Sequence, residues 1–115
     1  MRNISFALTT KQFVNRTKTV TRRLGWKFLK VGDRLAGCEK CQGLKKDQKI
    51  KKLGMIRVTS VARIPLDSIS PDDCIKEGFP ELTPSEFINF FCGAHKDCTP
   101  GTIVTRIEFE YLGNE

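Results

Sequence analysis

Two helix-start signals lie close together in the second half of this 115-residue sequence, and they limit the folds that it can adopt. Ser70 is followed by Pro71, so a capping residue precedes a proline at the first helical position. Thr83 and Glu86 have the spacing of a capping box. We therefore expect two short helices here, each ended by a glycine.

Strand patterns lie on both sides of this helical segment. Residues 3–8, 55–64 and 103–112 alternate between apolar and other side chains, and residues 34–38 follow a tight turn. A further short helix is expected to start at Thr10, as its N-cap. Strands that come first and last, with helices between them, indicate an α+β fold: a small mixed β-barrel with two or three short helices. No repeat or boundary divides the 115 residues, so we expect one domain.

The charge of the chain favours anionic partners. Its 20 basic and 13 acidic residues give a formal net charge of +7, which suits nucleic acid, although a basic surface can also serve solubility alone. Apolar runs are too short to span a membrane, and the N-terminus lacks the apolar core of a secretory signal. We therefore expect a cytoplasmic protein, taken as a monomer, whose five cysteines stay reduced.

Residues 17–23 concentrate basic and hydroxyl side chains in one short segment. If this segment is extended, Thr21 and Arg23 share one face while Lys18 and Arg22 share the other. A twist or bulge near Lys18 is then needed to bring Lys18 and Thr21 to one point. The alternative is a solvated strand edge, where Lys and Thr discourage aggregation.

A second group of side chains has the chemistry of nucleic-acid recognition. Arg22 and Arg23 can grip phosphate bidentately, and an exposed Trp26 offers a base a stacking platform. Lys45 and Lys46 belong to a lysine-rich stretch that can follow a backbone electrostatically. The alternatives are a tryptophan in the core or the wall of a cleft, and an ordinary solvated loop.

Five side chains have the spacing of zinc ligands: Cys38 and Cys41 in a C-x2-C pair, and Cys92, His95 and Cys98 in a C-x2-H-x2-C run. Gly43 stands behind the first pair, as in zinc knuckles. Four of the five would complete a closed tetrahedral site, with three cysteines and the histidine or with four cysteines, so the zinc would be structural. It would staple a Lys/Cys-rich insertion at about residues 38–54 to the end of the second helix. The alternative is that Cys38 and Cys92 are small buried apolar residues.

The order of the elements and four short motifs resemble a known family. The motifs are Lys18-Thr19-Val20-Thr21-Arg22-Arg23, Gly32-Asp33-Arg34-Leu35, Glu77-Gly78-Phe79 and Val104-Thr105-Arg106-Ile107-Glu108-Phe109. As an ordered set they resemble the ASCH family of small PUA-like β-barrels, and the length is typical of its single-domain bacterial and phage members. The resemblance implies a cleft that accepts RNA or a nucleoside.

One bacterial branch of the family hydrolyses the acetyl amide of N4-acetylcytidine with a lysine, a threonine and a glutamate. By position, the resemblance implies that Lys18, Thr21 and Glu77 are the catalytic residues here, and that Arg23 is the arginine beyond the threonine. Arg22 and the Lys/Cys-rich insertion depart from that branch. Both favour a larger or more charged ligand than a bare nucleoside.

The chemistry of such a site depends on the charge of Lys18. A threonine hydroxyl such as that of Thr21 needs a base beside it, and Lys18 can be that base only when neutral. Glu77 would pass the proton to the leaving amine or hold Lys18 in place. If Glu77 instead keeps Lys18 charged, the pair becomes a substrate clamp, and the chain is a non-catalytic RNA-binding adaptor with a zinc-stapled loop. A third interpretation makes that loop a protein-interaction surface.

Overall fold

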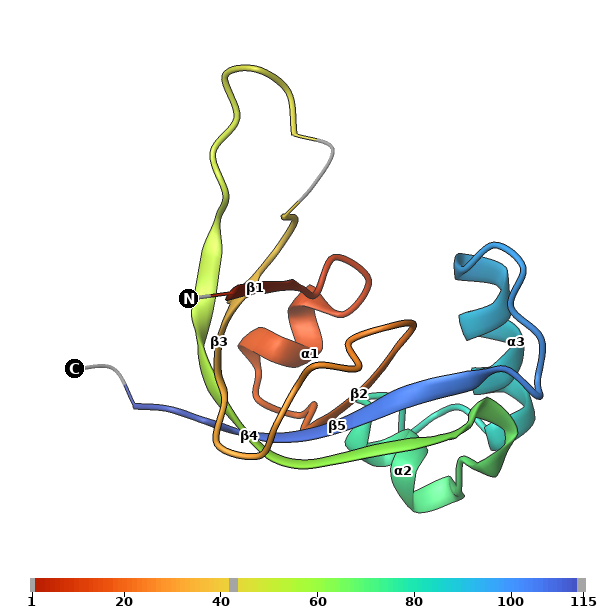
Figure 1. Ribbon diagram of the computed structural model, residues 1–115. Coiled ribbons are helices and arrows are strands. Elements are labelled where there is room, and N and C mark those ends of the chain that lie inside the picture. Colours follow the sequence, from red (N-terminus) through yellow and green to blue (C-terminus); the bar gives the residue numbers. More distant parts are fainter. Residues whose placement is uncertain (1, 42–43, 114–115) are drawn as a thin grey trace.

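The computed structural model describes residues 2–41 and 44–113, and in this part of the chain a curled five-stranded sheet is accompanied by three helices (Figure 1). The elements in chain order are β1 (Arg2–Ser5), α1 (Thr10–Val14), β2 (Val20–Arg23), β3 (Arg34–Cys38), β4 (Lys52–Pro65), a 3₁₀ turn (Leu66–Ser68), α2 (Pro71–Lys76), α3 (Pro84–Ala94) and β5 (Ile103–Tyr111). The strand order is β1-β3-β4-β5-β2; β1 and β3 pair in parallel, and the other pairs are antiparallel. This mixed half-barrel confirms the predicted α+β class.

The long strands β4 and β5 determine the shape of the sheet. They pair from Ile56 opposite Tyr111 to Pro65 opposite Ile103, with a shift of register between Val58 and Ser60. Such irregularities bend a strand and increase its twist, which lets a sheet curl. In Figure 1 the two strands run side by side, α1 lies inside the curve of the sheet, and α2 and α3 gather at the end where β4 leads into them.

Apolar side chains form two clusters. The first lies between α1 and the sheet: Ile4, Phe6, Phe13, Leu29, Leu35, Ile56, Val58, Ile107 and Phe109. Within it Phe13 stacks on Phe6, with ring centroids 4.3 Å apart. The second joins α2 and α3 to the ends of β4 and β5: Leu66, Ile69, Cys74, Phe79, Phe87, Phe91 and Val104. Because the two clusters are distinct, the boundary between them can hold polar groups.

Both of the predicted helix starts are confirmed by their hydrogen bonds. The Ser70 hydroxyl accepts from the Asp73 backbone N–H at 3.1 Å at the start of α2. At α3 the Thr83 hydroxyl accepts from the Glu86 backbone N–H at 3.2 Å, and the Glu86 carboxylate accepts from the Thr83 backbone N–H at 2.9 Å. No helix in the described part of the chain is both long and apolar enough to cross a membrane.

The first strand and helix differ from the sequence prediction. β1 ends at Ser5, and the chain turns before α1, so Leu8 is 61% exposed rather than facing a core. The N-cap position of α1 is Thr9 instead of Thr10. The Thr10 hydroxyl donates to the Phe6 carbonyl at 2.8 Å. A local hydrogen bond of this kind competes with strand pairing, and alternation alone does not reveal it.

Gly37 lies where the core leaves no room for a side chain. A Cβ built there would lie 2.4 Å from Cζ of Phe13, whereas a Cβ at Gly54, its partner in the β3–β4 register, would lie 3.7 Å from the same ring. We expect Gly37→Ala to lower the free energy of unfolding by about 1–3 kcal/mol, because overpacking moves a buried ring. Gly54→Ala is the matched control, with an expected effect below about 1 kcal/mol. Urea unfolding of both variants is the measurement, and equal losses would contradict the clash.

Candidate functional site

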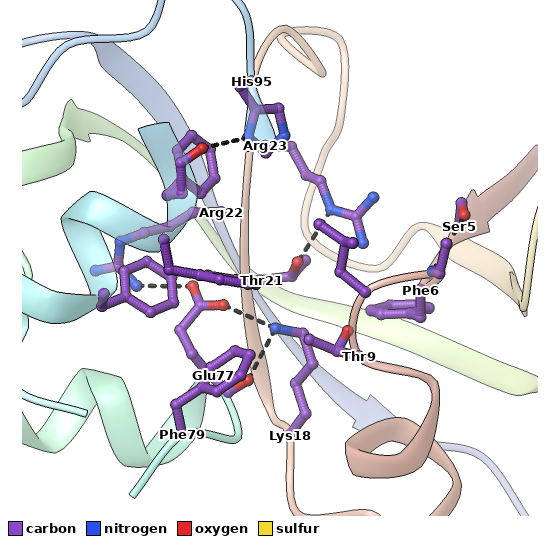
Figure 2. Close-up of a pocket in the computed structure, with 15 residues that line it drawn as sticks. Ser5, Phe6, Thr9, Lys18, Thr21, Arg22, Arg23, Glu77, Phe79 and His95 are labelled. Atoms are coloured by element: carbon purple, nitrogen blue, oxygen red, sulfur yellow. Dashed lines mark hydrogen bonds and ion pairs between the residues drawn. The ribbon is translucent and has the colours of Figure 1, made fainter. Parts of the chain in front are cut away.

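A cavity of about 200 Å³ lies where the two apolar clusters meet (Figure 2). It is lined by Ser5, Phe6, Ala7, Leu8, Thr9, Lys18, Thr21, Arg22, Arg23, Glu77, Phe79, Phe87, Phe90, Phe91 and His95. Phe6 comes from the first cluster and Phe87 from the second, so the cavity spans their junction. All three residues predicted to be catalytic line it, together with both arginines of the 17–23 segment.

Strand alternation does not limit which side chains of the 17–23 segment reach the cavity. β2 begins only at Val20, so Lys18 precedes the strand and its direction is independent of the strand faces. Lys18 therefore meets Thr21 at one cavity, as the expected bend requires. The chain before the strand is held by the Thr19 backbone N–H, which donates to the Lys76 carbonyl at 2.8 Å.

Lys18 forms a buried ion pair with Glu77. Lys18 Nζ lies 2.7 Å from Glu77 Oε1 and donates to the Glu77 backbone carbonyl at 3.0 Å, and both side chains are 3% exposed. Glu77 is the C-cap residue of α2, and Gly78 follows it with φ +96°, a conformation that glycine adopts without strain. The helix end thus places a carboxylate, which the helix dipole disfavours there, against a buried ammonium.

Arg22 holds the other oxygen of the Glu77 carboxylate. Arg22 Nη1 lies 3.0 Å from Glu77 Oε2, and Arg22 Nη2 lies 2.6 Å from Asp73 Oδ2. Asp73 also accepts two bonds from Arg106, at 2.7 Å and 3.0 Å. Three cations and two carboxylates therefore form one connected set, which we call the charge chain: Lys18, Glu77, Arg22, Asp73 and Arg106. Each ionised group in it has an opposite charge beside it, the condition under which buried charge is tolerated.

Burial has the largest effect on the pKa of Lys18. It lowers the pKa of Lys18 below the ordinary value of 10.5; Glu77 opposes this shift, and the positive charges of Arg23 and Arg22 add to it. A lower pKa increases the fraction of neutral amine near pH 7, and the neutral amine is the form that accepts a proton.

Asp73 is the acid whose ionisation should couple folding to pH. Hydrogen bonds from Arg106 and then Arg22 hold the pKa of Asp73 well below its ordinary value of 3.8. Its contribution to stability is therefore complete above about pH 4 and is lost as the pH falls towards its folded-state pKa, because the unfolded chain then binds more protons. We expect Asp73→Asn to reduce the difference in unfolding free energy between pH 5 and pH 2.5, measured by urea unfolding. Asp47→Asn, at an exposed loop position, is the control, and an equal change in both variants would contradict the coupling.

Thr21 is paired with Arg23. Arg23 Nε donates to Thr21 Oγ1 at 3.0 Å, and the guanidinium lies over the Phe6 ring, 5.0 Å from its centroid. Because Thr21 Oγ1 accepts from Arg23, the hydroxyl hydrogen of Thr21 remains available for donation. Among the described residues no hydrogen bond joins Thr21 to Lys18.

An aromatic wall faces these polar groups: Phe79, Phe87, Phe90, Phe91 and His95. The rings of Phe79 and Phe90 have centroids 5.1 Å apart, and Phe90 is 37% exposed. His95 stacks on Phe91 at 4.1 Å, and its Nδ1–H donates to the Phe91 carbonyl at 2.9 Å, since a carbonyl can only accept. Phe87 and Phe91 are also buried members of the second apolar cluster, and the sequence analysis did not predict this wall. Its only signal is the density of aromatic residues on one helix.

Two solved structures share this architecture. One is the crystal structure of a DUF984 family protein from Enterococcus faecalis, with a TM-score of 0.68 at 18% identity over 97% of this chain and 76% of that one. The other is the ASCH domain from Lactobacillus crispatus, with a TM-score of 0.65 at 15% identity over 96% of this chain and 78% of that one. The chain has an ASCH-type fold. No family model and no curated protein matches the sequence.

The ASCH-type fold leaves three of the predicted nucleic-acid-binding residues away from the cavity. Trp26 has φ +54° and packs against the first apolar cluster, with its ring 5.4 Å from that of Phe28. Lys45 and Lys46 are exposed in the loop between β3 and β4, where the Lys45 carbonyl accepts from the Gln48 backbone N–H at 2.9 Å. Of the five predicted residues, the cavity therefore brings together only the two arginines.

The predicted zinc ligands form separate groups in the ASCH-type fold. Cys38 is buried and its Sγ donates to the Ala36 carbonyl at 3.5 Å; burial raises the pKa of Cys38 to about 11, and Cys41 adds to the shift. Cys92 Sγ lies 3.7 Å from Cys98 Sγ, while His95 faces the cavity. In residues 2–41 and 44–113, no three His, Cys, Asp or Glu side chains gather closely enough to hold a metal ion.

This arrangement does not fit a four-ligand site, and zinc binding stays a prediction. Gly43, which supported the first pair, lies outside the described residues. The prediction requires one zinc per chain in protein purified without a histidine tag, measured by inductively coupled plasma mass spectrometry. Cys41→Ser combined with Cys98→Ser should remove the metal. A content far below one per chain in the unsubstituted protein would end the prediction.

Proposed function

We propose that this chain with an ASCH-type fold binds a modified nucleoside, free or within RNA, and hydrolyses the amide of an N4-acylated cytidine. The observation that carries the proposal is the buried pair of Lys18 and Glu77 at the same cavity as Thr21. Ionisable groups with a shifted pKa that lie beside a nucleophile in a cleft are typical of catalytic sites. The proposed place of action is the reducing cytoplasm.

The cavity suits one base better than a large ligand. Its volume of about 200 Å³ is below the roughly 300–1,000 Å³ of pockets for drug-sized molecules. Phe90 and His95 belong to an aromatic wall on which a pyrimidine ring can stack, and Arg23 and Thr21 supply donors opposite it.

The reaction would use three side chains in sequence. Neutral Lys18 takes the proton of the Thr21 hydroxyl as Thr21 Oγ1 attacks the acyl carbonyl carbon. The Arg23 guanidinium already donates a hydrogen bond to Thr21 Oγ1. It therefore stabilises the negative charge that develops on the neighbouring acyl oxygen. The carbon–nitrogen bond then breaks, and the proton passes from Lys18, assisted by Glu77, to the N4 nitrogen of the leaving cytidine. Water hydrolyses the acyl ester on Thr21, releasing the carboxylic acid and restoring the hydroxyl.

A second function, binding without catalysis, is favoured by the two ion pairs that Glu77 forms with Lys18 and Arg22. Its carboxylate is shared between Lys18 and Arg22, and that contact supports a charged Lys18. A permanently charged Lys18 would serve as a clamp for an anionic or carbonyl group. Glu77→Gln separates the two functions: it should abolish turnover in an enzyme, whereas in a binding module it should leave affinity unchanged or raise it.

The test is an incubation of the purified protein with N4-acetylcytidine, followed by chromatography for cytidine. We expect the unsubstituted chain to release cytidine and acetate in equal amounts, and Thr21→Ala to release neither. Thr19→Ala, a change in the same segment but outside the cavity lining, is the matched control. Absence of release at high protein concentration would overturn the hydrolase and leave binding as the function.

A further inference from the structure

A second hollow adjoins the cavity, between the β3–β4 loop and the segment that follows β1. Its volume is about 540 Å³, and it is lined by Ala7, Glu39, Lys40, Leu44, Gln48, Lys49 and Lys51. Ala7 lines both hollows, so the second opens directly beside the first. Of its three lysines, Lys49 and Lys51 belong to the same lysine-rich stretch of the sequence as Lys45 and Lys46.

Backbone hydrogen bonds hold the base of the loop against the cavity wall. Ser5 pairs with Cys38 in the parallel β1–β3 register, and the Phe6 backbone N–H donates to the Cys38 carbonyl at 2.8 Å. The Ser5 hydroxyl donates to the Glu39 carbonyl at 3.3 Å, and the Glu39 backbone N–H donates to the Lys51 carbonyl at 3.0 Å. Ser5 and Phe6 also line the cavity, so the distance between the two hollows is set by paired backbone.

The charge of this second hollow is positive. Lys40, Lys49 and Lys51 line it together with a single acid, Glu39, and an ion pair joins Lys51 Nζ to Glu39 Oε2 at 3.6 Å. Both side chains of that pair are exposed, 72% and 47%, so the pair contributes little and an incoming anion can replace it.

The cavity carries positive charge on the side towards the loop. Burial lowers the pKa of Arg23 to about 10, and Glu77 and Cys41, the latter from the loop, oppose that shift. Arg23 therefore stays a cation at neutral pH, and its guanidinium lies over the ring of Phe6, whose backbone N–H donates to the Cys38 carbonyl where the loop begins. The positive groups thus extend from the cavity to the lysine hollow.

We propose that the lysine hollow is a phosphate subsite, and that the ligand is a single-stranded nucleotide chain with one base in the cavity and a neighbouring phosphate on Lys49 and Lys51. This inference rests on the proposed function for the base in the cavity and adds the class of ligand. A base can enter a cavity of this size only when it is outside a duplex. Phosphate contacts by lysine hold the register of a strand without reading its sequence.

The test compares three probes by isothermal titration calorimetry: cytidine, cytidine 5′-monophosphate and the RNA trinucleotide UCU. We expect the trinucleotide to bind at least roughly tenfold more tightly than cytidine at 50 mM salt. One neutralised phosphate gives a log–log salt slope of about −0.7, a loss of roughly two- to threefold between 50 and 200 mM, whereas cytidine binding should hardly respond.

Lys49→Gln combined with Lys51→Gln removes the subsite and leaves the cavity. We expect this double variant to lose the salt slope and the advantage of the trinucleotide, with cytidine affinity unchanged. Lys27→Gln combined with Lys30→Gln, at exposed positions that line neither hollow, is the matched control and should behave as the unsubstituted chain.

Different results overturn different claims. Equal affinity for trinucleotide and cytidine, or a double variant that matches its control, would overturn the phosphate subsite while base binding stands. If cytidine 5′-monophosphate binds as tightly as the trinucleotide, the nucleotide strand is overturned as the ligand. Trinucleotide binding that depends on the two lysines, with no detectable cytidine binding, would support the phosphate contacts and overturn base binding in the cavity.

Discussion

Lys18→Met is expected to lower the rate of cytidine release from N4-acetylcytidine by roughly 10²–10⁴-fold, the range that a general base contributes. Methionine has a similar length and no basic group, so it fills the buried space of Lys18 without accepting a proton. Burial lowers the pKa of Lys18, which increases the fraction of neutral amine that can act as the base. Steady-state kinetics with chromatographic detection is the measurement.

Lys18→Arg separates a base from a clamp. A guanidinium keeps the positive charge and the ion pair with Glu77 but does not deprotonate at accessible pH. We therefore expect Lys18→Arg to lose turnover as Lys18→Met does, while retaining more affinity for cytidine. Lys11→Met, at an exposed position of α1, is the control. Full turnover in Lys18→Arg would show that no proton passes through residue 18.

Glu77→Ala is expected to lower the free energy of unfolding by about 3–5 kcal/mol, the cost of removing one partner from a buried ion pair. The side chains of Lys18 and Arg22 are 3% and 1% exposed, so water cannot replace the lost carboxylate. The alanine also leaves a void where a fully buried side chain stood. Chemical unfolding by urea, followed by circular dichroism, is the measurement.

Two further variants show whether burial causes this loss. Glu110→Ala breaks an ion pair with Arg57 whose side chains are 45% and 47% exposed, and such pairs contribute about 0–1 kcal/mol. Glu77→Gln keeps an oxygen that can accept from Lys18 or Arg22, so its loss should be smaller than that of alanine. If Glu77→Ala and Glu110→Ala cost the same, the charge chain does not contribute to stability through burial.

Several elements could be predicted because their causes are local. The caps of α2 and α3 depend on hydrogen bonds between residues three positions apart, Ser70 with Asp73 and Thr83 with Glu86, so their signals are contiguous in the sequence. The β5 strand was read from alternation over adjacent residues and is found at Ile103–Tyr111. The assignment of Lys18 to a site came from the family resemblance, and no local pattern required it.

Capping, alternation and composition act over a few residues, so most of the elements, their order and the charge of the chain could be predicted from the sequence. Which groups meet depends on contacts between distant segments of the folded chain. Lys18 and Glu77 are 59 positions apart, and Arg22 and Asp73 are 51 apart, so their pairing depends on how the end of α2 packs against β2. The same packing turns the phenylalanines of α3 into a cavity wall, and it leaves the cysteines as separate groups instead of one ligand set. Such contacts form between distant segments, and no local pattern in the sequence encodes them.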